Sequence, residues 1–366
     1  MTRSFRHLLD VCLKRRLTFA AFRAPHGPIE LWVQHQPETE RISWEALDAM
    51  VNRFLVMPFV ADPRGPLGIA PDVRILSGSA ADADPALTDC LGTNELHQHE
   101  QVVPADASSI FTESVDSAKK RMAHGSMAKV VLSRAQQVDL APEQLPDLFA
   151  HALQSSPEVL VALVSLPEHG TWLGASPERL INVSQDRIRV DSLAGTVPVR
   201  TFNDEVGAWG SKEREEQAMV TAGVVGAFRA TGYTDVNTNG PNVVTAGPVA
   251  HLLTTVSAPV GDRSPASLVR ELHPTPAVCG TPRSEAMSFI LANEPVQRGL
   301  YAGFWGPWRS VRDGQLFVNI RCLQHAEGTA TIHAGAGITA ASDPDKELRE
   351  TEEKARTWLA PIAALK

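Results

Sequence analysis

The sequence has few cysteines and no long apolar run. Its four cysteines, Cys12, Cys90, Cys279 and Cys322, form neither a C-x-x-C pair nor a zinc-ligand spacing, which indicates buried thiols in a reducing compartment. No window approaches the ~18 apolar residues of a membrane span. Near the N-terminus, basic residues are dispersed through the apolar positions, whereas a signal peptide places its charges first. We therefore expect a cytoplasmic protein without a membrane segment.

An excess of positive charge is also absent. The 42 acidic and 34 basic side chains give a formal charge of −8, which argues against sequence-independent binding of nucleic acid. The hydrophobic share of 43% and the charged share of 21% exclude a disordered protein or a fibre. A chain of 366 residues predicts two lobes or one large two-layer body. No coiled-coil seam requires a partner, so we expect a monomer.

The pattern of the chain changes near residue 105. Residues 1–105 contain short strand patterns broken by proline and aspartate, and we assign no chemistry to this N-terminal part. The segment His97-x-His99-Glu100 could contribute to a metal site. The alternative is a set of ordinary surface residues, because the two histidines share a strand face without a third ligand placed beside them. Residues 106–366 contain the motifs that follow, and we assign the catalytic region there.

The elements expected after residue 105 are two clusters of strands between helices. They comprise helices at 109–124, 212–229 and from 342 onward, and strands at 129–133, 159–166, 180–183, 187–190, 316–321 and 329–333. The strands are not separated by regular helical crossovers. This order predicts a mainly antiparallel α+β body rather than a parallel sheet.

Two helices carry paired glutamates at the same spacing. Glu213 and Glu216 lie at i and i+3 where the apolar stripe of the 212–229 helix reaches its first turn, and Glu347 and Glu350 repeat this spacing in the last helix. A solvated first turn is the alternative, because acidic residues suit the helix dipole there. Four carboxylates without histidine or cysteine suit Mg²⁺, the cofactor that we expect.

The segment 335–340 formally matches the dinucleotide motif G-x-G-x-x-A after a strand. That motif requires a helix to open within the glycines, whereas the helix signals here lie later, at Ser342–Pro344. An NAD-dependent oxidoreductase is therefore a minor alternative. Backbone amides of a loop at Gly335, Ala336 and Gly337 could instead bind a carboxylate.

Several further segments place charged or polar residues among apolar ones. In chain order the segments are K-V-V-L-S-R (129–134), A-S-P-E (175–178), L-A-G-T (193–196), K-E-x-x-E (212–216), H-P-T-P-A-V-C-G (273–280), N-I-R (319–321), A-G-A-G-I (334–338) and S-D-P-x-x-E-x-x-E-T (342–351). Each motif alone is weak, but the ordered set is highly specific. Through this set the chain resembles the chorismate-utilising enzymes.

The resemblance implies a large, mainly antiparallel β-sandwich flanked by helices, with chorismate and Mg²⁺ in a cleft between its halves. The resemblance to isochorismate synthases is the strongest, because ammonia-using relatives such as anthranilate synthase lack a lysine at position 129. Salicylate synthases usually carry threonine where Ala277 stands, at a position linked to pyruvate elimination. Gln217 departs from many relatives, which have histidine after the second glutamate. The product would serve siderophore, menaquinone or salicylate synthesis.

The expected reaction adds water to C2 of chorismate while the C4 hydroxyl leaves. Lys129 is the candidate base, because burial disfavours its ammonium form, and Glu178 is the candidate acid for the C4 oxygen. Each residue has an alternative interpretation when the resemblance is set aside. Lys129 could extend from the end of a strand to solvent. Glu178 could belong to the capped first turn of a helix.

The remaining site residues follow from the resemblance. Arg321 and the amides around Gly335–Gly337 would bind the enolpyruvyl carboxylate, because a guanidinium can pair with both carboxylate oxygens. The other expected contacts are ring lining by Gly195 and Thr196, His251 near the reacting side of the ring, and charge balance by Lys354. The rival functions are a salicylate synthase and a non-catalytic regulator that binds chorismate and Mg²⁺.

Overall fold

The computed structural model describes residues 1–49, 52–82, 84–93, 101–199, 209–246 and 249–365. His97, His99 and Glu100, the sequence-based metal candidates, lie outside the described residues. Among the described helices, none has the length and apolar character needed to cross a membrane.

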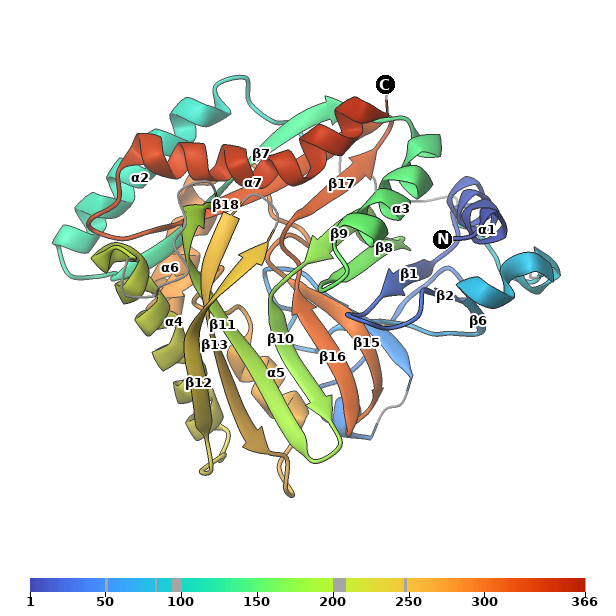
Figure 1. The fold of residues 1–366 in the computed structure, drawn as a ribbon, viewed down its shortest axis with the longest axis horizontal. Helices are drawn as coiled ribbons and strands as arrows, with labels where there is room; N and C mark the ends of the chain where they lie inside the picture. Colours follow the sequence, from blue (N-terminus) through green and yellow to red (C-terminus); the bar gives the residue numbers. More distant parts are fainter. Residues whose placement is uncertain (50–51, 83, 94–100, 200–208, 247–248, 366) are drawn as a thin grey trace.

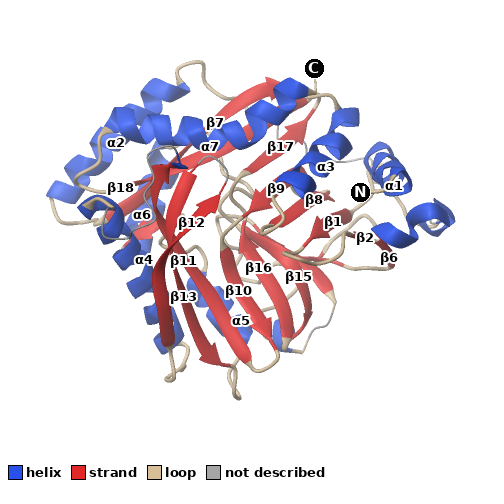
Figure 2. Ribbon diagram, in the orientation of Figure 1, coloured by secondary structure: helices blue, strands red, loops and turns tan. Residues whose placement is uncertain are grey.

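Two nine-stranded sheets form the body of the protein (Figure 2). The first sheet has the order β14 (Gly280–Thr281), β7 (Lys129–Asp139), β18 (Thr329–Ile338), β17 (Cys322–Ala326), β9 (Gly170–Ser176), β8 (Leu160–Leu166), β1 (Phe19–Arg23), β2 (Glu30–Val33), β6 (Val73–Leu76). The second has the order β12 (Asn237–Ala246), β13 (Val249–Pro259), β11 (Arg187–Pro198), β10 (Arg179–Ser184), β16 (Asp313–Val318), β15 (Phe304–Ser310), β4 (Arg53–Met57), β5 (Leu67–Ile69), β3 (Glu40–Arg41). Neighbouring strands are antiparallel throughout the described chain, which confirms the predicted α+β sandwich. Residues before 105 supply the last three strands at one end of each sheet, β1, β2 and β6 in the first and β4, β5 and β3 in the second.

In the described parts of the chain, seven α-helices surround the sheets (Figure 1). They are α1 (Arg3–Lys14), α2 (Ala107–Ala123), α3 (Leu145–Ser155), α4 (Ser211–Ala230), α5 (Pro265–Leu272), α6 (Arg283–Asn293) and α7 (Pro344–Ala364). Helix α7 packs along β18, and α4 packs on β11 and β13. These contacts place one glutamate-bearing helix on each sheet. Short 3₁₀ turns occur at Ala46–Asp48, Ser77–Asp82, Asp84–Leu87 and Pro142–Gln144.

Strand β8 shows how the first sheet is buried on both faces. Ala162 and Val164 join the main core between the sheets, whereas Val161 and Leu163 join a second core beneath α1, α3 and α7. Side chains alternate across a strand, so a sheet covered on both faces needs the near-continuous apolar run that predicted this strand.

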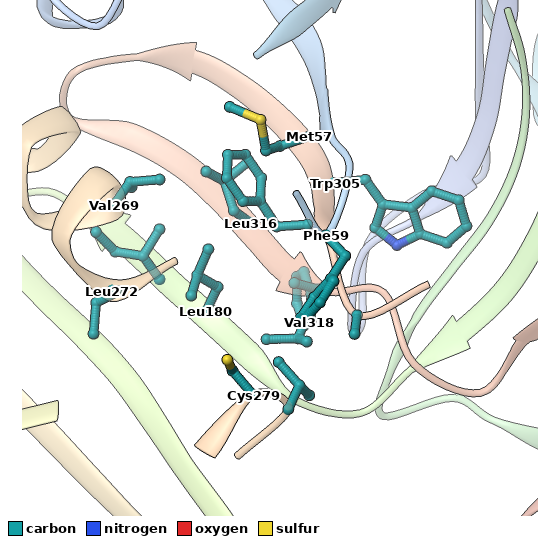
Figure 3. Packing of buried hydrophobic residues seen from close by; sticks show 14 of the residues in the cluster. Met57, Phe59, Leu180, Val269, Leu272, Cys279, Trp305, Leu316 and Val318 are labelled. Carbon is teal, nitrogen blue, oxygen red and sulfur yellow. The ribbon is translucent and has the colours of Figure 1, made fainter. Parts of the chain in front are cut away.

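The main core also fixes a motif of the predicted site. Figure 3 shows Cys279 among packed apolar side chains that include Leu180 and Val318. Cys279 is completely buried, and its backbone N–H donates to the Thr275 carbonyl. The H-P-T-P-A-V-C-G segment is therefore anchored at its C-terminal end, which fixes the position of Ala277 two residues earlier.

Two sequence-based boundaries were wrong. The strand expected to end at Arg321 ends at Val318, and Arg321 adopts a left-handed φ of 52° between β16 and β17. The loop expected at Gly335–Gly337 is part of β18, which pairs with β7 up to Ile338. Strand β17 pairs with β18 only over Thr329–His333, so beyond this point β18 has no β17 partner.

Candidate active site

A cavity of about 60 Å³ lies where β7, β18, β11 and β13 meet α4 and α7. The residues that line it are Val131, Glu178, Leu193, Ala194, Thr196, Glu216, His251, Ala277, Val278, Tyr301, Ile320, Arg321, His333, Ala334, Gly335, Gly337, Glu350 and Lys354. Segments separated by more than 200 residues in the sequence thus contribute to one concave site. Most of the predicted acid–base and binding residues lie in its wall.

Glu178, the predicted acid, lies in the short connection between β9 and β10, not in a helix turn. It is 2% exposed, and the Thr275 hydroxyl lies 3.5 Å from its Oε1. Burial, together with the negative charge of Asp191, raises the pKa of Glu178 to about 8, against the opposing charge of Lys129. A carboxyl group in this setting is protonated at neutral pH and can donate a proton.

Lys129, the predicted base, begins β7 and is completely buried. It does not extend to solvent, which excludes the alternative of an exposed strand end. Its Nζ lies 3.0 Å from Oε1 of Glu216 on α4. Although Lys129 is not among the described residues that line the cavity, its amine contacts the wall through Glu216. This ion pair was not predicted, because the sequence indicated only desolvation of the amine.

The glutamates of α4 and α7 are paired with lysines. The described ion pairs are Lys129–Glu216, Lys212–Glu347 and Lys354–Glu350, and the last has an N–O distance of 2.7 Å. The fourth carboxylate, Glu213, turns back to the start of its own helix, since a Cβ at Gly210 would lie 2.4 Å from its Oε2. The structure therefore joins the two acidic helix turns through Lys212, but it does not bring all four carboxylates together.

The lysine pairing changes the acidity of the buried carboxylates. Burial acts to raise the pKa of Glu216, but the charges of Lys129 and Lys212 outweigh it and lower the pKa. For Glu347, burial and the nearby charge of Glu350 raise the pKa despite its contact with Lys212. The lysines thus stabilise Glu216 as a carboxylate, whereas Glu347 is left in an environment where an added positive charge is favourable.

The carboxylate oxygens of these glutamates are ligands of the kind that a hard cation prefers. Across the described part of the chain, no three side chains of histidine, cysteine, aspartate or glutamate are already arranged as a metal site. The negative charges of Glu347, Glu350 and Glu216 nevertheless stabilise one cationic group, the Lys212 ammonium, which contacts Glu347 directly. An oxygen-only set that already attracts positive charge is compatible with Mg²⁺.

Arg321 and His251 form a directed pair in the cavity wall. Burial holds the pKa of His251 well below its usual value, so the ring is neutral. Its Nδ1 lies 3.2 Å from the Gly195 carbonyl and its Nε2 3.2 Å from Arg321 Nη2, so Nδ1–H donates and Nε2 accepts. The buried Nη1 of Arg321 has no partner in the described protein and is available to an anion in the cavity.

Gly195 connects the L-A-G-T motif to the first acidic turn. It has a left-handed φ of 69° at a bulge in β11, and a Cβ there would lie 2.9 Å from the backbone oxygen of Glu213. A glycine allows both the conformation and the close approach of α4. Thr196, the next residue, lines the cavity, and its hydroxyl lies 3.2 Å from Nδ1 of His251.

The glycines of β18 create space for functional side chains. A Cβ at Gly337 would lie 2.0 Å from Glu216 Oε1, and one at Gly335 would lie 2.6 Å from the Tyr301 hydroxyl. Ala336 lies between them and packs in the main core instead, because strand residues alternate between faces. Lys354 Nζ donates to the Gly335 carbonyl over 2.7 Å, which anchors α7 to this strand.

Two aromatic residues of the cavity were missed by the sequence analysis. Tyr301 and His333 stack with ring centroids 5.2 Å apart, and both line the cavity. Burial lowers the pKa of His333 to about 3, so this ring is neutral. The period-two pattern that places His333 on the same face as Gly335 and Gly337 could have identified it.

Gln217, the departure from the usual histidine, turns away from the carboxylates. Its Nε2 donates to the Ser192 carbonyl over 2.8 Å and to the Thr254 hydroxyl over 3.1 Å. The side chain therefore anchors α4 to β11 and β13 of the second sheet.

Comparisons with known proteins agree with this geometry. Residues 80–363 match the family model described as chorismate binding enzyme. The chain is 33% identical over 275 residues to isochorismate synthase DhbC of Bacillus subtilis, covering 70% of this chain and 69% of the relative. The vibriobactin-specific isochorismate synthase of Vibrio cholerae is 30% identical, over 84% of this chain and 78% of that protein.

Solved structures show the same fold. The DhbC structure from Bacillus anthracis superposes with a TM-score of 0.77 at 25% identity, covering 98% of this chain and all of that one. The menaquinone-specific synthase MenF of Escherichia coli gives a TM-score of 0.76 at 21% identity, covering 98% of this chain and 90% of that one. With the family model matched over most of its length, the chain belongs to the chorismate binding enzymes.

Proposed function

We propose that the protein is an isochorismate synthase, which converts chorismate into isochorismate. Water adds at C2 of the ring, the double bonds shift, and the C4 hydroxyl leaves as water, so the net reaction is an isomerisation. The names of the relatives support this activity. The observation that carries it is the buried Glu178, which faces the same cavity as Arg321 and as Glu216, the partner of Lys129.

Glu178 supplies the acid in this mechanism. Hydroxide is a poor leaving group, so the C4 oxygen must receive a proton as its bond to carbon breaks. The pKa of about 8 keeps Glu178 protonated at neutral pH, and its cavity position allows it to donate. Thr275 contacts the carboxyl group and restricts its orientation.

Lys129 supplies the base. Water becomes an effective nucleophile only if a proton acceptor lies beside it, and lysine can serve once its ammonium group, paired in the structure with Glu216, has lost a proton. Lys129 lies behind the cavity wall, in contact with the wall residue Glu216, and acts electrostatically on Glu178. The base and the acid therefore come from different elements, β7 and the β9–β10 connection.

Arg321 binds a substrate carboxylate. Its Nη1 has no partner in the described protein, and its Nη2 is positioned by the neutral His251 ring. The guanidinium is therefore oriented to bind an anion in the cavity. Backbone amides near Gly335–Gly337, on the part of β18 without a β17 partner, would assist. Gly195 and Thr196 would border the ring on the opposite sheet.

Mg²⁺ would be held by Glu216, Glu347 and Glu350, with Glu213 as the fourth expected carboxylate. When bound, the ion would supply positive charge that offsets the negative charge of these glutamates and of chorismate. Like charges a few ångströms apart otherwise repel by about 4 kcal/mol at an effective dielectric near 20. Lys354, which already pairs with Glu350, would contribute further charge balance.

A salicylate synthase is the second candidate, because it would share the first step and then eliminate pyruvate. Ala277 lines the cavity with a small apolar side chain, and this favours a reaction that stops at isochorismate. A dinucleotide oxidoreductase is disfavoured, because the glycines lie within β18 and α7 begins at Pro344. A non-catalytic regulator predicts stabilisation by chorismate without turnover.

Product analysis separates these functions. The purified protein is incubated with chorismate and Mg²⁺, and the products are resolved by HPLC. Isochorismate alone supports the proposal, salicylate plus pyruvate supports the second candidate, and unchanged chorismate contradicts both.

A further inference from the structure

Lys212 lies between the two helices that carry the predicted metal ligands. It belongs to the first turn of α4, and its Nζ donates to Oε1 of Glu347 in the first turn of α7. The Glu347 side chain is 2% exposed, whereas that of Lys212 is 22% exposed. This ion pair directly links α4, which packs on the second sheet, to α7, which packs on the first.

Two further carboxylates act on the same ammonium group. Burial lowers the pKa of Lys212, but the negative charges of Glu347, Glu350 and Glu216 outweigh this effect and raise it. Glu350 lies one turn after Glu347 on α7, and Glu216 lies one turn after Lys212 on α4. The ammonium therefore contacts one carboxylate of α7 directly and is stabilised by the charges of carboxylates on both helices.

Lys212 differs from the other two lysines of this cluster. Lys129 is completely buried at the start of β7, and Lys354 also donates to the Gly335 carbonyl. Lys212 is partly exposed and bonded to Glu347. Its long side chain can move to solvent without leaving a buried charge of its own.

We propose that Lys212 is a tethered counter-ion that neutralises these carboxylates in the metal-free enzyme and competes with the divalent cation for Glu347. This inference rests on the proposed Mg²⁺ dependence. Both cations need the same carboxylate oxygens, so metal binding displaces the lysine toward solvent. Lys212 thus weakens Mg²⁺ binding while it prevents repulsion between α4 and α7 in the metal-free state.

The direct test measures the binding of Mg²⁺ alone, by isothermal titration calorimetry, to the metal-free protein and its Lys212→Met variant. We expect the variant to bind about tenfold more tightly, which corresponds to about 1.4 kcal/mol. It should also unfold at a lower temperature in EDTA and regain stability when Mg²⁺ is added. Lys346→Met is the matched control, because it removes the same charge from an exposed position in the first turn of α7.

Equal affinity in all three proteins would overturn the proposal, and so would an equal gain in both variants, since that is a general charge effect. No binding to any of them would overturn it as well. If Lys212→Met does not fold, Lys212→Gln replaces it with the same expectation, because the amide keeps a donor for Glu347 without the charge. Isochorismate formation by the unmodified protein is measured in parallel, so that a failure of the proposed function is detected separately.

Discussion

The Lys129 amine lies 3.0 Å from Oε1 of Glu216, and both side chains are buried. The contact joins β7 of the first sheet to α4, which packs on the second. It thereby connects the predicted base with the predicted cation site, two features that the sequence places almost 90 residues apart. A change at either residue is expected to affect the other.

Replacement of Lys129 by alanine should abolish most turnover. We expect kcat to fall by about 10²-fold or more, the lower end for lost acid–base catalysis. The measurement is steady-state isochorismate formation, with circular dichroism as the control for folding. Lys346→Ala, which removes an exposed lysine, should keep native kcat. Near-native turnover in a folded Lys129→Ala protein would remove Lys129 from the role of base.

Glu178 gives the activity a predicted pH dependence. It must be protonated to act as the acid, so kcat/KM should fall as pH rises through about 8, the raised pKa of Glu178. Because the negative charge of Asp191 contributes to that rise, Asp191→Asn should move the alkaline limb to lower pH. Glu178→Gln should lower kcat by about 10²-fold or more. An alkaline limb at the same pH in Asp191→Asn would contradict this electrostatic account.

Gly337→Ala should damage the site without removing any polar group. The added Cβ would lie 2.0 Å from Glu216 Oε1, so the carboxylate or β18 must move, and we expect a severe loss of activity. Gly226→Ala in α4 is the matched control, because a Cβ there has no atom within 4 Å. It should keep activity and gain about 0.5–1 kcal/mol in the free energy of unfolding. Equal activity in the two variants would show that the Gly337–Glu216 contact has no functional role.

Removal of divalent cations should stop the reaction. We expect EDTA to abolish turnover and added Mg²⁺ to restore it, because chorismate adds two negative charges to a cavity already lined by glutamates. The measurement is isochorismate formation before and after metal is returned. Undiminished activity in EDTA would count against the whole carboxylate scheme.

The sequence predicted the fold class through its strand clusters and ordered motifs, and it predicted the helix that carries Glu347. Asp343 caps that helix, since its side chain accepts from the Lys346 backbone N–H over 3.0 Å. Gly335–Gly337 was expected in a loop because the segment matches a glycine-rich loop motif that follows a strand. Here Glu216 and Tyr301 occupy the space that larger side chains would need, and β7 supplies the pairing.

The lysine partners of the glutamates could not be predicted in the same way. Lys212 and Glu347 are 135 residues apart, and only the packing of α4 on the second sheet and of α7 on the first brings them together. The i,i+4 pair of Glu350 and Lys354, by contrast, follows from helical geometry alone. Helical periodicity therefore predicted the spacing of the glutamate pairs, whereas the arrangement of their lysine partners required the tertiary structure.

The most direct test of the mechanism follows the oxygen of the attacking water. The protein is incubated with chorismate and Mg²⁺ in water labelled with heavy oxygen, and the isochorismate is analysed by mass spectrometry. The account predicts one labelled oxygen in the product, at C2, because the new hydroxyl comes from solvent and the C4 hydroxyl is lost. Isochorismate without label would contradict it, since the hydroxyl would then have moved within the substrate and no base would be needed to activate water.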